Sequence, residues 1–358
     1  MHTDILIIGA GFAGTATAYH LSQNFHGTIV VIEAEPKPGL HASGLNASMV
    51  IQPSHSESIR ELCSRSRFFY QNHLDMTGFK QLGSLMLGSI SSLENLQDPE
   101  MFASYLWSAT KTKKQVPLLE NHNFKSAIWT PSDGIMDIQK LLYFYTRSAN
   151  ENGVRFCCGQ RVKKIHRKKK NKFKVSTTEG EITADRVVNA AGAWAGHLAT
   201  VSGATSLEIL VLKRHLFILE PSLSIDPECP SVWNLDKEFY FRPYCGSLLF
   251  CPCDKKPAHS LDSNIDPEIQ EYMTKTLKKE LPLLNDSKQR DCWSCFRVFT
   301  PDGLPFIGPD PSLPDFYWVA GLAGYGMSAS WEIGRLAALS IIDGQFKPEF
   351  DPSRMQSN

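Results

Sequence analysis

Three glycines near the N-terminus have the spacing that could hold a pyrophosphate. Gly9, Gly11 and Gly14 follow the apolar run at residues 5–8, and a segment with apolar residues at helical spacing begins at residue 15. In such a turn the first glycine allows the bend, the second lets the main chain approach the phosphates, and the third lets the helix pack on the strand. Free N–H groups at the start of that helix would face the anion. The triplet therefore predicts a dinucleotide-binding turn.

An acidic residue stands where such a site holds a ribose. A second apolar run, residues 28–32, ends at Glu33, which lies 19 residues beyond Gly14. A carboxylate about 20 residues after the third glycine typically accepts the ribose hydroxyls, and it would repel a 2′-phosphate, so NADP is disfavoured. A glycine-rich turn without a ligand is the alternative. The order of strand, glycines, helix, second strand and acid favours the dinucleotide site.

A second group of residues near the C-terminus could face another part of the ligand. Arg297 lies in an apolar run that ends in a Pro-Asp-Gly turn at residues 301–303. A loop containing Gly324 and Gly326 then opens a helix that we expect to extend through Ile342. The amides at the start of that helix could face an anionic or electron-rich group.

The composition restricts the class of protein. The 358 residues carry 37 Lys and Arg against 37 Asp and Glu, so charge suggests neither a nucleic-acid partner nor an anionic membrane surface. No apolar segment approaches the roughly 18 residues of a membrane span, and no leader precedes the first strand. We expect a soluble, cytoplasmic protein. The basic run at residues 166–172 lies between two strand-like segments and predicts a solvated hairpin tip.

The cysteines offer one alternative chemistry, a zinc site or a redox dithiol. Cys292 and Cys295 have C-x-x-C spacing, and Cys251 and Cys253 could complete a four-thiolate site. The two pairs differ in spacing, and neither stands where a helix is expected to start. Since nine cysteines occur without a secretory signal, we expect reduced thiols and no metal.

The order of the elements predicts two interleaved domains in an α/β fold. Strand-like runs at residues 84–89, 207–219, 239–242 and 248–251 interrupt the nucleotide-binding pattern, and residues 93–109 and 267–279 look helical. We place the nucleotide-binding domain at residues 1–79, 137–204 and 291–358, and the substrate-binding domain at residues 80–136 and 205–290.

In these motifs the sequence resembles the D-amino-acid oxidase-like flavoproteins, which include glycine oxidase, sarcosine oxidase and the D-amino-acid dehydrogenases. Within the group it is most similar to the D-arginine dehydrogenase type. The resemblance covers nearly the whole chain. It is carried by the opening triplet with Glu33, Pro38-Gly39-x-His41-x-Ser43-Gly44, Asn189 to Trp194, Phe239-Tyr240, Arg297, and Gly324-Tyr325-Gly326.

The resemblance implies that the cofactor is FAD. It implies a Rossmann-like FAD-binding domain into which an antiparallel-sheet substrate domain of α+β type is inserted. The adenosine end would lie at residues 9–33, with the backbone of Val162 beside the adenine. The residues implied to bind FAD are Gly9, Gly11, Gly14, Glu33, Ser43, Gly44, Val162, Gly192, Gly324, Gly326 and Met327.

The resemblance also implies which residues bind and orient the substrate. Arg297 would hold a carboxylate, because a guanidinium matches it bidentately and stays charged at any working pH. Tyr240 would add its hydroxyl, and Arg214 matches a second arginine near the site, although its basic neighbours allow a shift in alignment. The alternatives are a surface ion pair for Arg297 and a half-buried strand aromatic for Tyr240.

Two segments depart from the enzymes that act on arginine. Residues 81–86 contain no acid for a basic side chain, and residues 48–51 are largely apolar where those enzymes have polar and aromatic residues. These differences favour a neutral or apolar amino acid. Cys295 aligns with the cysteine that links FAD covalently in sarcosine oxidases, and a free, packed thiol is the alternative.

The expected reaction is oxidative deamination of a small amino acid, of D configuration or glycine-like, by hydride transfer from Cα to flavin N5. His41 and His55 are the nearest candidates for assisting deprotonation of the amine. The alternatives are a flavin-dependent 2-hydroxy-acid dehydrogenase, a non-catalytic flavin-binding protein, and an NAD-dependent dehydrogenase. The electron acceptor stays open among oxygen, a quinone and a soluble carrier, and a quinone would imply contact with a membrane surface.

Overall fold

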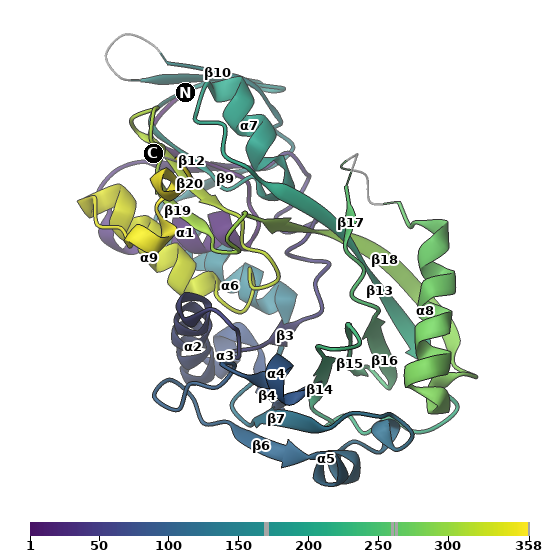
Figure 1. Cartoon of the computed structure of the whole chain (residues 1–358). Helices are drawn as coiled ribbons and strands as arrows, with labels where there is room; N and C mark the ends of the chain where they lie inside the picture. The colour runs from purple at the N-terminus through teal and green to yellow at the C-terminus, as the bar shows by residue number, and fades with distance from the viewer. Residues whose placement is uncertain (168–171, 259–260, 262–263, 357–358) are drawn as a thin grey trace.

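The structure is a computed structural model that describes residues 1–167, 172–258, 261 and 264–356. Two large β-sheets occupy different ends of the molecule (Figure 1). The two chain ends lie close to the first sheet, and the second sheet is built mainly from the middle of the chain (Figure 1).

The first sheet grows from the apolar run before the glycine triplet. β1 (His2–Ile8) pairs in parallel with β2 (Ile29–Ile32) and β12 (Gly180–Asn189). Its residues 5–8 are buried, which explains why they are apolar throughout and do not alternate. The strand order is β10-β11-β12-β1-β2-β9, with β20 on β12 and β19 on β20. The other strands are β9 (Arg155–Cys157), β10 (Val162–Arg167), β11 (Phe173–Thr177), β19 (Phe306–Pro309) and β20 (Phe316–Ala320).

The predicted Rossmann-like α/β sheet is therefore confirmed. β10 and β11 also pair antiparallel, as the strand-like segments on either side of the basic run predicted. Residues 168–171 of the predicted hairpin tip lie outside the described residues.

Helices cover the first sheet. α1 (Phe12–Asn24) follows the glycine triplet and packs against α9 (Ser330–Asp343). The two helices approach closely because Gly334 faces Ala16: a Cβ on Gly334 would lie 2.8 Å from the Ala16 Cβ. The other helices of this region are α2 (Glu57–Asn72), α3 (Leu74–Thr77), α6 (Ile138–Glu151) and α7 (Ala195–Ser202).

The second sheet carries one long two-stranded ladder. β13 (Leu210–Glu220) pairs antiparallel with β18 (Lys288–Phe299) over nearly the full length of both strands. The rest of the sheet follows the order β17-β13-β16-β15-β14-β5-β7-β6 and is antiparallel except for the parallel pair β14 and β5. These strands are β5 (Ser84–Gly88), β6 (Tyr105–Ser108), β7 (Ser126–Thr130), β14 (Ser231–Asn234), β15 (Phe239–Tyr244), β16 (Ser247–Cys251) and β17 (Lys256–Pro257).

The division into domains stays a proposal. β18 belongs to the second sheet although most of it falls in the 291–358 segment assigned to the nucleotide-binding domain. α8 (Pro267–Glu280) covers one face of the second sheet, where Ile269, Met273 and Leu277 join its buried core.

The helix predicted at residues 93–109 is wrong. α4 (Ile90–Leu93) ends where that helix should begin, and α5 (Ala109–Gln115) starts where it should end. Between them, β6 pairs with β7, so that Leu106 lies opposite Ile128. Pairing with a distant strand decides the structure here, and the local spacing of apolar residues does not show it.

Three short strands form a separate third sheet, and Asp133 directly precedes one of them. β8 (Gly134–Met136) pairs with β3 (Met49–Val50) and with β4 (Phe79–Gln81). The buried Asp133 carboxylate accepts hydrogen bonds from Gln52 Nε2 at 2.8 Å and from Ser84 Oγ at 2.6 Å. It thereby ties the end of β3 to the start of β5.

We expect the Asp133 carboxyl to lower stability as the pH rises through neutrality. Burial raises its pKa to about 7, whereas in the unfolded chain it titrates at about 4. The folded protein therefore holds a proton that the unfolded chain has released, and the stability from the protonated group is present below about pH 4 and lost as the pH rises through about 7. The free energies of unfolding of the wild type and of Asp133→Asn can be measured in urea at about pH 5 and about pH 8. We expect the variant to be more stable relative to the wild type at the higher pH than at the lower one. An unchanged difference in unfolding free energy would contradict this.

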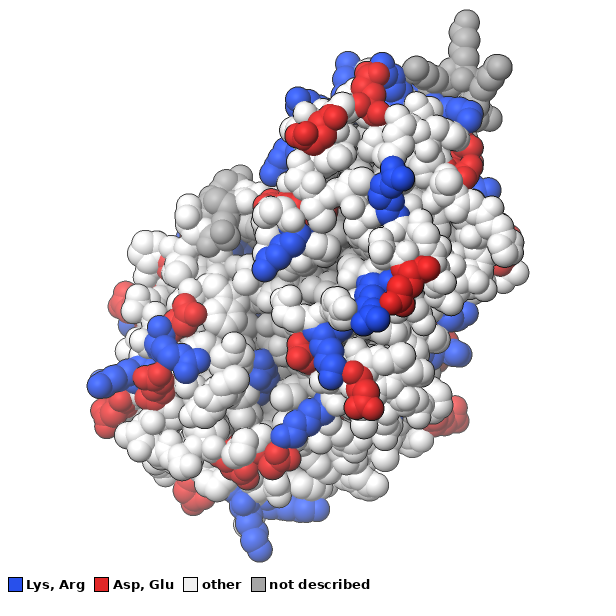
Figure 2. Space-filling model, turned by 180° about the vertical axis from the view of Figure 1, so that it is seen from behind, with Lys and Arg blue, Asp and Glu red and all other residues white. Residues whose placement is uncertain are grey.

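Basic and acidic side chains are interspersed on the face of the molecule shown in Figure 2. This mixture agrees with the balanced composition of 37 basic and 37 acidic residues. None of the described helices is both long enough and apolar enough to pass through a bilayer.

Candidate active site

Two adjoining cavities are lined by residues of both large sheets. Their volumes are about 490 Å³ and about 640 Å³. They share lining residues, including Gly11, Ser43, Gly192 and Phe296, so they form one elongated space. Such a space suits an extended ligand with a small molecule at one end.

Gly9 and Gly11 of the triplet line the first cavity, and Gly14 packs behind them. Gly9 has a φ of 107°, and a Cβ there would lie 2.4 Å from the Ala190 carbonyl oxygen. A Cβ on Gly14 would lie only 1.9 Å from the Gly9 carbonyl oxygen. These positions therefore require glycine, because any side chain would separate the helix from the turn. The cradle fits a pyrophosphate at the start of α1.

Glu33 and Ser43 contribute polar side chains to this cavity, and main-chain N–H groups hold both of them in place. The Glu33 carboxylate lines it and accepts N–H groups from Ala10 at 2.7 Å and from Glu35 at 3.0 Å. Ser43 Oγ accepts the N–H of Phe12, the first residue of α1, at 2.9 Å. These contacts hold an acid and a hydroxyl beside the glycine turn, where a dinucleotide would place its ribose and phosphates.

Most of the residues expected to bind the cofactor line this space. In the first cavity they are Gly9, Gly11, Glu33, Ser43, Val162 and Gly192, and in the second they are Gly11, Ser43, Gly192, Gly324, Gly326 and Met327. Gly14 and Gly44 line neither cavity. A Cβ on Gly44 would lie 2.3 Å from the Gly39 carbonyl oxygen, so both glycines allow main-chain segments to pack closely.

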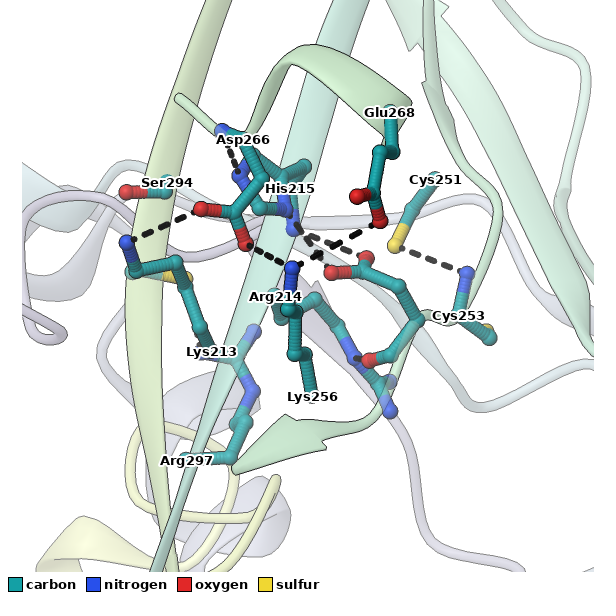
Figure 3. Close-up of polar contacts among 12 residues, drawn as sticks. Lys213, Arg214, His215, Cys251, Cys253, Lys256, Asp266, Glu268, Ser294 and Arg297 are labelled. Atoms are coloured by element: carbon teal, nitrogen blue, oxygen red, sulfur yellow. Dashed lines mark hydrogen bonds and ion pairs between the residues drawn. The ribbon is translucent and has the colours of Figure 1, made fainter. Parts of the chain in front are cut away.

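The three expected substrate residues lie together in the second cavity. Arg214, Tyr240 and Arg297 all line it, and each is less than a tenth exposed. Arg214 on β13 lies opposite Cys295 on β18. Because side chains alternate along a strand, Arg297 projects from the same face as Cys295, next to Arg214. Figure 3 shows the two arginines on these neighbouring strands.

Neither guanidinium is neutralised by direct contact. Arg297 Nη1 donates to Cys295 Sγ at 3.0 Å, and Arg214 Nε donates to the Asp254 carbonyl oxygen at 3.2 Å. In the part of the chain that the structure describes, no carboxylate forms an ion pair with either guanidinium. A buried cation without an acidic partner is unfavourable, so this end of the cavity is built to receive an anion.

Tyr240 supplies a neutral donor beside these cations. Burial raises the pKa of the Tyr240 phenol well above its ordinary value, so its hydroxyl keeps its proton at neutral pH. It can donate that proton in a hydrogen bond to an anion held by the two arginines.

The rest of the second cavity is largely apolar. Its acid, Asp302, is held by Arg354 through contacts of 2.8 and 3.2 Å. Its apolar lining includes Met49, Ile51, Met86, Leu96, Trp233 and Leu235. Such walls suit a small or apolar side chain and offer no free acid to a basic one.

The two histidine candidates lie in different cavities. His41 lines the first cavity, where its Nε2 contacts Glu35 at 3.1 Å. His55 lines the second cavity and is exposed. Of these two histidines, His55 alone shares a cavity with the three residues expected to bind the substrate.

The C-x-x-C pair does not converge on a common site. Cys292 and Cys295 both lie in β18, and residues three apart in a strand point to opposite faces. Cys295 joins the buried cluster that contains Tyr240 and Cys251, whereas Cys292 packs on the other core. This arrangement favours separate thiols over a shared metal.

Sequence reasoning missed the side chains that hold the glycine-rich loop at residues 324–328. Tyr70 Oη on α2 donates to the Met327 carbonyl oxygen at 2.8 Å. Ser328 Oγ donates to the Met49 carbonyl oxygen at 3.0 Å and so ties this loop to the small sheet. These contacts join residues far apart in the chain, and no local spacing indicates them.

Comparison with known proteins places this geometry in context. A family model described as "FAD dependent oxidoreductase" (DAO) matches residues 4–339. Rat mitochondrial dimethylglycine dehydrogenase is 25% identical over 390 residues, and the mouse mitochondrial pyruvate dehydrogenase phosphatase regulatory subunit is 25% identical over 366 residues. These alignments cover 99% and 95% of this chain but 44% and 41% of the relatives, so the chain spans less than half their length.

The fold also matches a solved structure. The L-proline dehydrogenase from P. horikoshii superposes with a TM-score of 0.90 at 24% identity, covering 99% of this chain and 98% of that one. This likeness supports the α/β architecture with its two large sheets.

Proposed function

The chain belongs to the DAO family of FAD dependent oxidoreductases, and from this premise we propose that it oxidises a small amino acid at its α carbon. FAD is its cofactor, and the glycine cradle, Glu33 and Ser43 would hold the adenosine and pyrophosphate half. One observation carries the proposal. Two buried guanidinium groups without acidic partners in the described chain face a largely apolar cavity that adjoins the cofactor space.

Arg297 and Tyr240 would bind the substrate carboxylate. The guanidinium offers a planar pair of donors and the phenol a third, and their burial excludes water that would compete for the anion. Arg214 would add a second positive charge. A carboxylate fixed at two oxygens leaves the α carbon with one main orientation, so the binding energy is used to position the C–H bond.

When bound, FAD supplies the flavin that accepts the hydride leaving the α carbon. With a primary amine, the nitrogen gives up one proton, and the resulting imino acid hydrolyses in water to a 2-oxo acid and ammonia; with an N-methylated amine, hydrolysis of the iminium would release the methylamine instead. Of the two histidine candidates for accepting this proton, His55 lines the cavity that contains Arg297 and Tyr240. An amine that arrives neutral needs no base.

The apolar lining supports a neutral substrate. Glycine, its N-methylated forms and small D-amino acids leave little to fill beyond the carboxylate, and Met86, Trp233 and Leu235 provide apolar contact. A closer likeness to the D-arginine dehydrogenase type would require an acid for the guanidinium of the substrate. Asp302, which Arg354 holds, does not offer one, so we propose the neutral class.

A non-catalytic flavin-binding role is the second candidate. It is favoured by the 25% identity to a protein named as a regulatory subunit, over 95% of this chain. A 2-hydroxy acid would fit the same carboxylate clamp but would need a base for its hydroxyl.

Anaerobic addition of single compounds to the flavin-loaded protein should separate these functions. Glycine, sarcosine, N,N-dimethylglycine, and D- and L-alanine and proline test the proposed class, while D-arginine and D- and L-lactate test the alternatives. We expect one or more small neutral amino acids to bleach the visible flavin absorbance. Bleaching by lactate alone would indicate a hydroxy-acid dehydrogenase, and the lack of bleaching by every compound would favour the non-catalytic role. Recolouring in air then distinguishes an oxidase from a dehydrogenase.

A further inference from the structure

The side chains behind Arg214 form a polar network outside the two cavities (Figure 3). β13 pairs with β17 at Leu212 and Lys213 and with β16 from Phe217 to Leu219. The loop that follows β16 lies along the edge of β13 between these two pairings. Asp254 of that loop takes the place of a strand partner, because its Oδ1 accepts the main-chain N–H of His215 at 2.9 Å.

The partners of His215 fix the position of its proton. Its fully buried ring has Nδ1 2.8 Å from Asp254 Oδ2, while Nε2 lies 3.2 Å from the main-chain nitrogen of Asp266. The Asp266 N–H can only donate, so Nε2 must accept and the proton stands on Nδ1, where the Asp254 carboxylate accepts it. Both carboxylate oxygens of Asp254 are therefore held by His215.

This arrangement determines where the Asp254 main chain lies, and the main chain in turn holds Arg214. The Asp254 carbonyl oxygen accepts the Nε–H of Arg214 at 3.2 Å. Holding Nε leaves the two Nη groups of Arg214 for a ligand in the second cavity, which Arg214 lines. An arginine side chain has many rotamers, so a fixed Nε restricts its guanidinium before the ligand arrives.

We propose that Asp254 and His215 are positioning residues for recognition of the substrate carboxylate, acting through Arg214. The inference rests on the proposed function, in which Arg214 faces that carboxylate. Asp254 holds the arginine directly by its carbonyl group, and His215 holds Asp254 by its ring and its main-chain N–H. Neither residue needs to touch the substrate.

Two substitutions of His215 separate the two ends of its ring. In His215→Asn the amide can reach Asp254 from the Nδ1 position but not Asp266, and in His215→Gln the amide can reach Asp266 from the Nε2 position but not Asp254. Both variants lose one buried hydrogen bond, so a purely structural role predicts similar effects. Positioning through Asp254 predicts that only His215→Gln weakens carboxylate binding, by about tenfold.

Asp254→Asn tests the other partner. The asparagine NH2 group would face Nδ1 of His215, so the ring proton would have to move to Nε2. That proton would then face the main-chain N–H of Asp266, which is also a donor. The matched control is Glu280→Gln. It alters another buried histidine–carboxylate contact of the same domain, His122 Nδ1 to Glu280 Oε2 at 3.3 Å, and neither of these residues lines a cavity.

The measurement is the Kd of acetate, read from the change that it produces in the flavin spectrum, together with kcat, KM and the unfolding temperature. We expect Asp254→Asn and His215→Gln to raise Kd and KM about tenfold with kcat within about twofold of wild type, while Glu280→Gln leaves Kd unchanged. In an Arg214→Ala background Asp254→Asn should raise Kd no further, because the group it positions is absent.

The contrary results are equally clear. Three results would overturn positioning and leave the proposed function intact. In the first, Asp254→Asn weakens acetate binding equally with and without Arg214; in the second, His215→Asn and His215→Gln raise Kd equally. In the third, the variants lower the unfolding temperature but leave Kd unchanged. If acetate does not perturb the wild-type flavin and no amino acid bleaches it, the proposed function itself fails.

Discussion

Arg297→Leu should lower kcat/KM for the amino-acid substrate about a thousandfold, or ~4 kcal/mol of transition-state stabilisation. The guanidinium of Arg297 is buried, and its loss removes both the positive charge and the pair of planar donors that match the carboxylate. FAD should stay bound, because the substitution leaves unchanged the glycine turn, Glu33 and Ser43, which would hold its adenosine and pyrophosphate half. Steady-state kinetics with the flavin spectrum as a check on cofactor content measures both.

Two further arginine variants make this result specific. Arg297→Lys keeps the charge but loses the planar fork, so we expect activity between those of the wild type and the leucine variant. Arg167→Gln is the matched control, because Arg167 Nη1 binds the Pro314 carbonyl oxygen at 2.6 Å and lies outside both cavities. If Arg297→Leu stays within about threefold of wild type, Arg297 does not bind the carboxylate.

Gly14→Ala should yield a protein isolated without its flavin. The new Cβ would lie 1.9 Å from the Gly9 carbonyl oxygen, so α1 must move away from the turn or the turn must distort. Overpacking of this kind costs about 1–3 kcal/mol, and here it falls on the contact that aligns the pyrophosphate cradle. The ratio of visible flavin absorbance to protein absorbance, followed by titration with FAD, should show an affinity at least about tenfold weaker.

Gly196→Ala provides the control for Gly14→Ala. Gly196 lies in α7, its Cβ would meet no atom within 4 Å, and its backbone is not left-handed. We expect normal flavin content in this variant. A yellow Gly14→Ala protein with unchanged affinity for FAD would contradict the role assigned to this glycine.

The cofactor half of the site could be predicted from the sequence because its signals are local. The strand, the triplet and the acid follow one another from residue 5 to Glu33, and each has a spacing set by backbone geometry. The structure places Gly9, Gly11 and Glu33 in one cavity wall. Their role in binding FAD stays a proposal until it is tested.

The substrate half depended on the family resemblance. Nothing in the spacing of Arg214, Tyr240 and Arg297 indicates that they meet, because the pairing of β13 with β18 brings two of them together across 83 residues. No pattern in the sequence indicates that Asp254 and His215 meet. The contact between them bridges 39 residues and depends on where β16 and β17 leave the edge of β13.

The incorrect helix at residues 93–109 illustrates the same limit. Apolar residues at helical spacing there serve a short helix, a loop and the edge strand β6 in turn. Only the partner strand β7 fixes which residues are extended.

The β13–β18 ladder also limits how genes of this type can change in length. Strands have a two-residue period, so inserting one codon in β18 between Lys288 and Arg297 would turn the arginine to the opposite face and bring Phe296 to its place. The strands are joined by a long excursion, residues 221–287, where additions leave the ladder register intact. Natural insertions and deletions should accumulate in the loops of that excursion away from Tyr240 and Asp254, and the two strands should keep a constant length among descendants of the same ancestor.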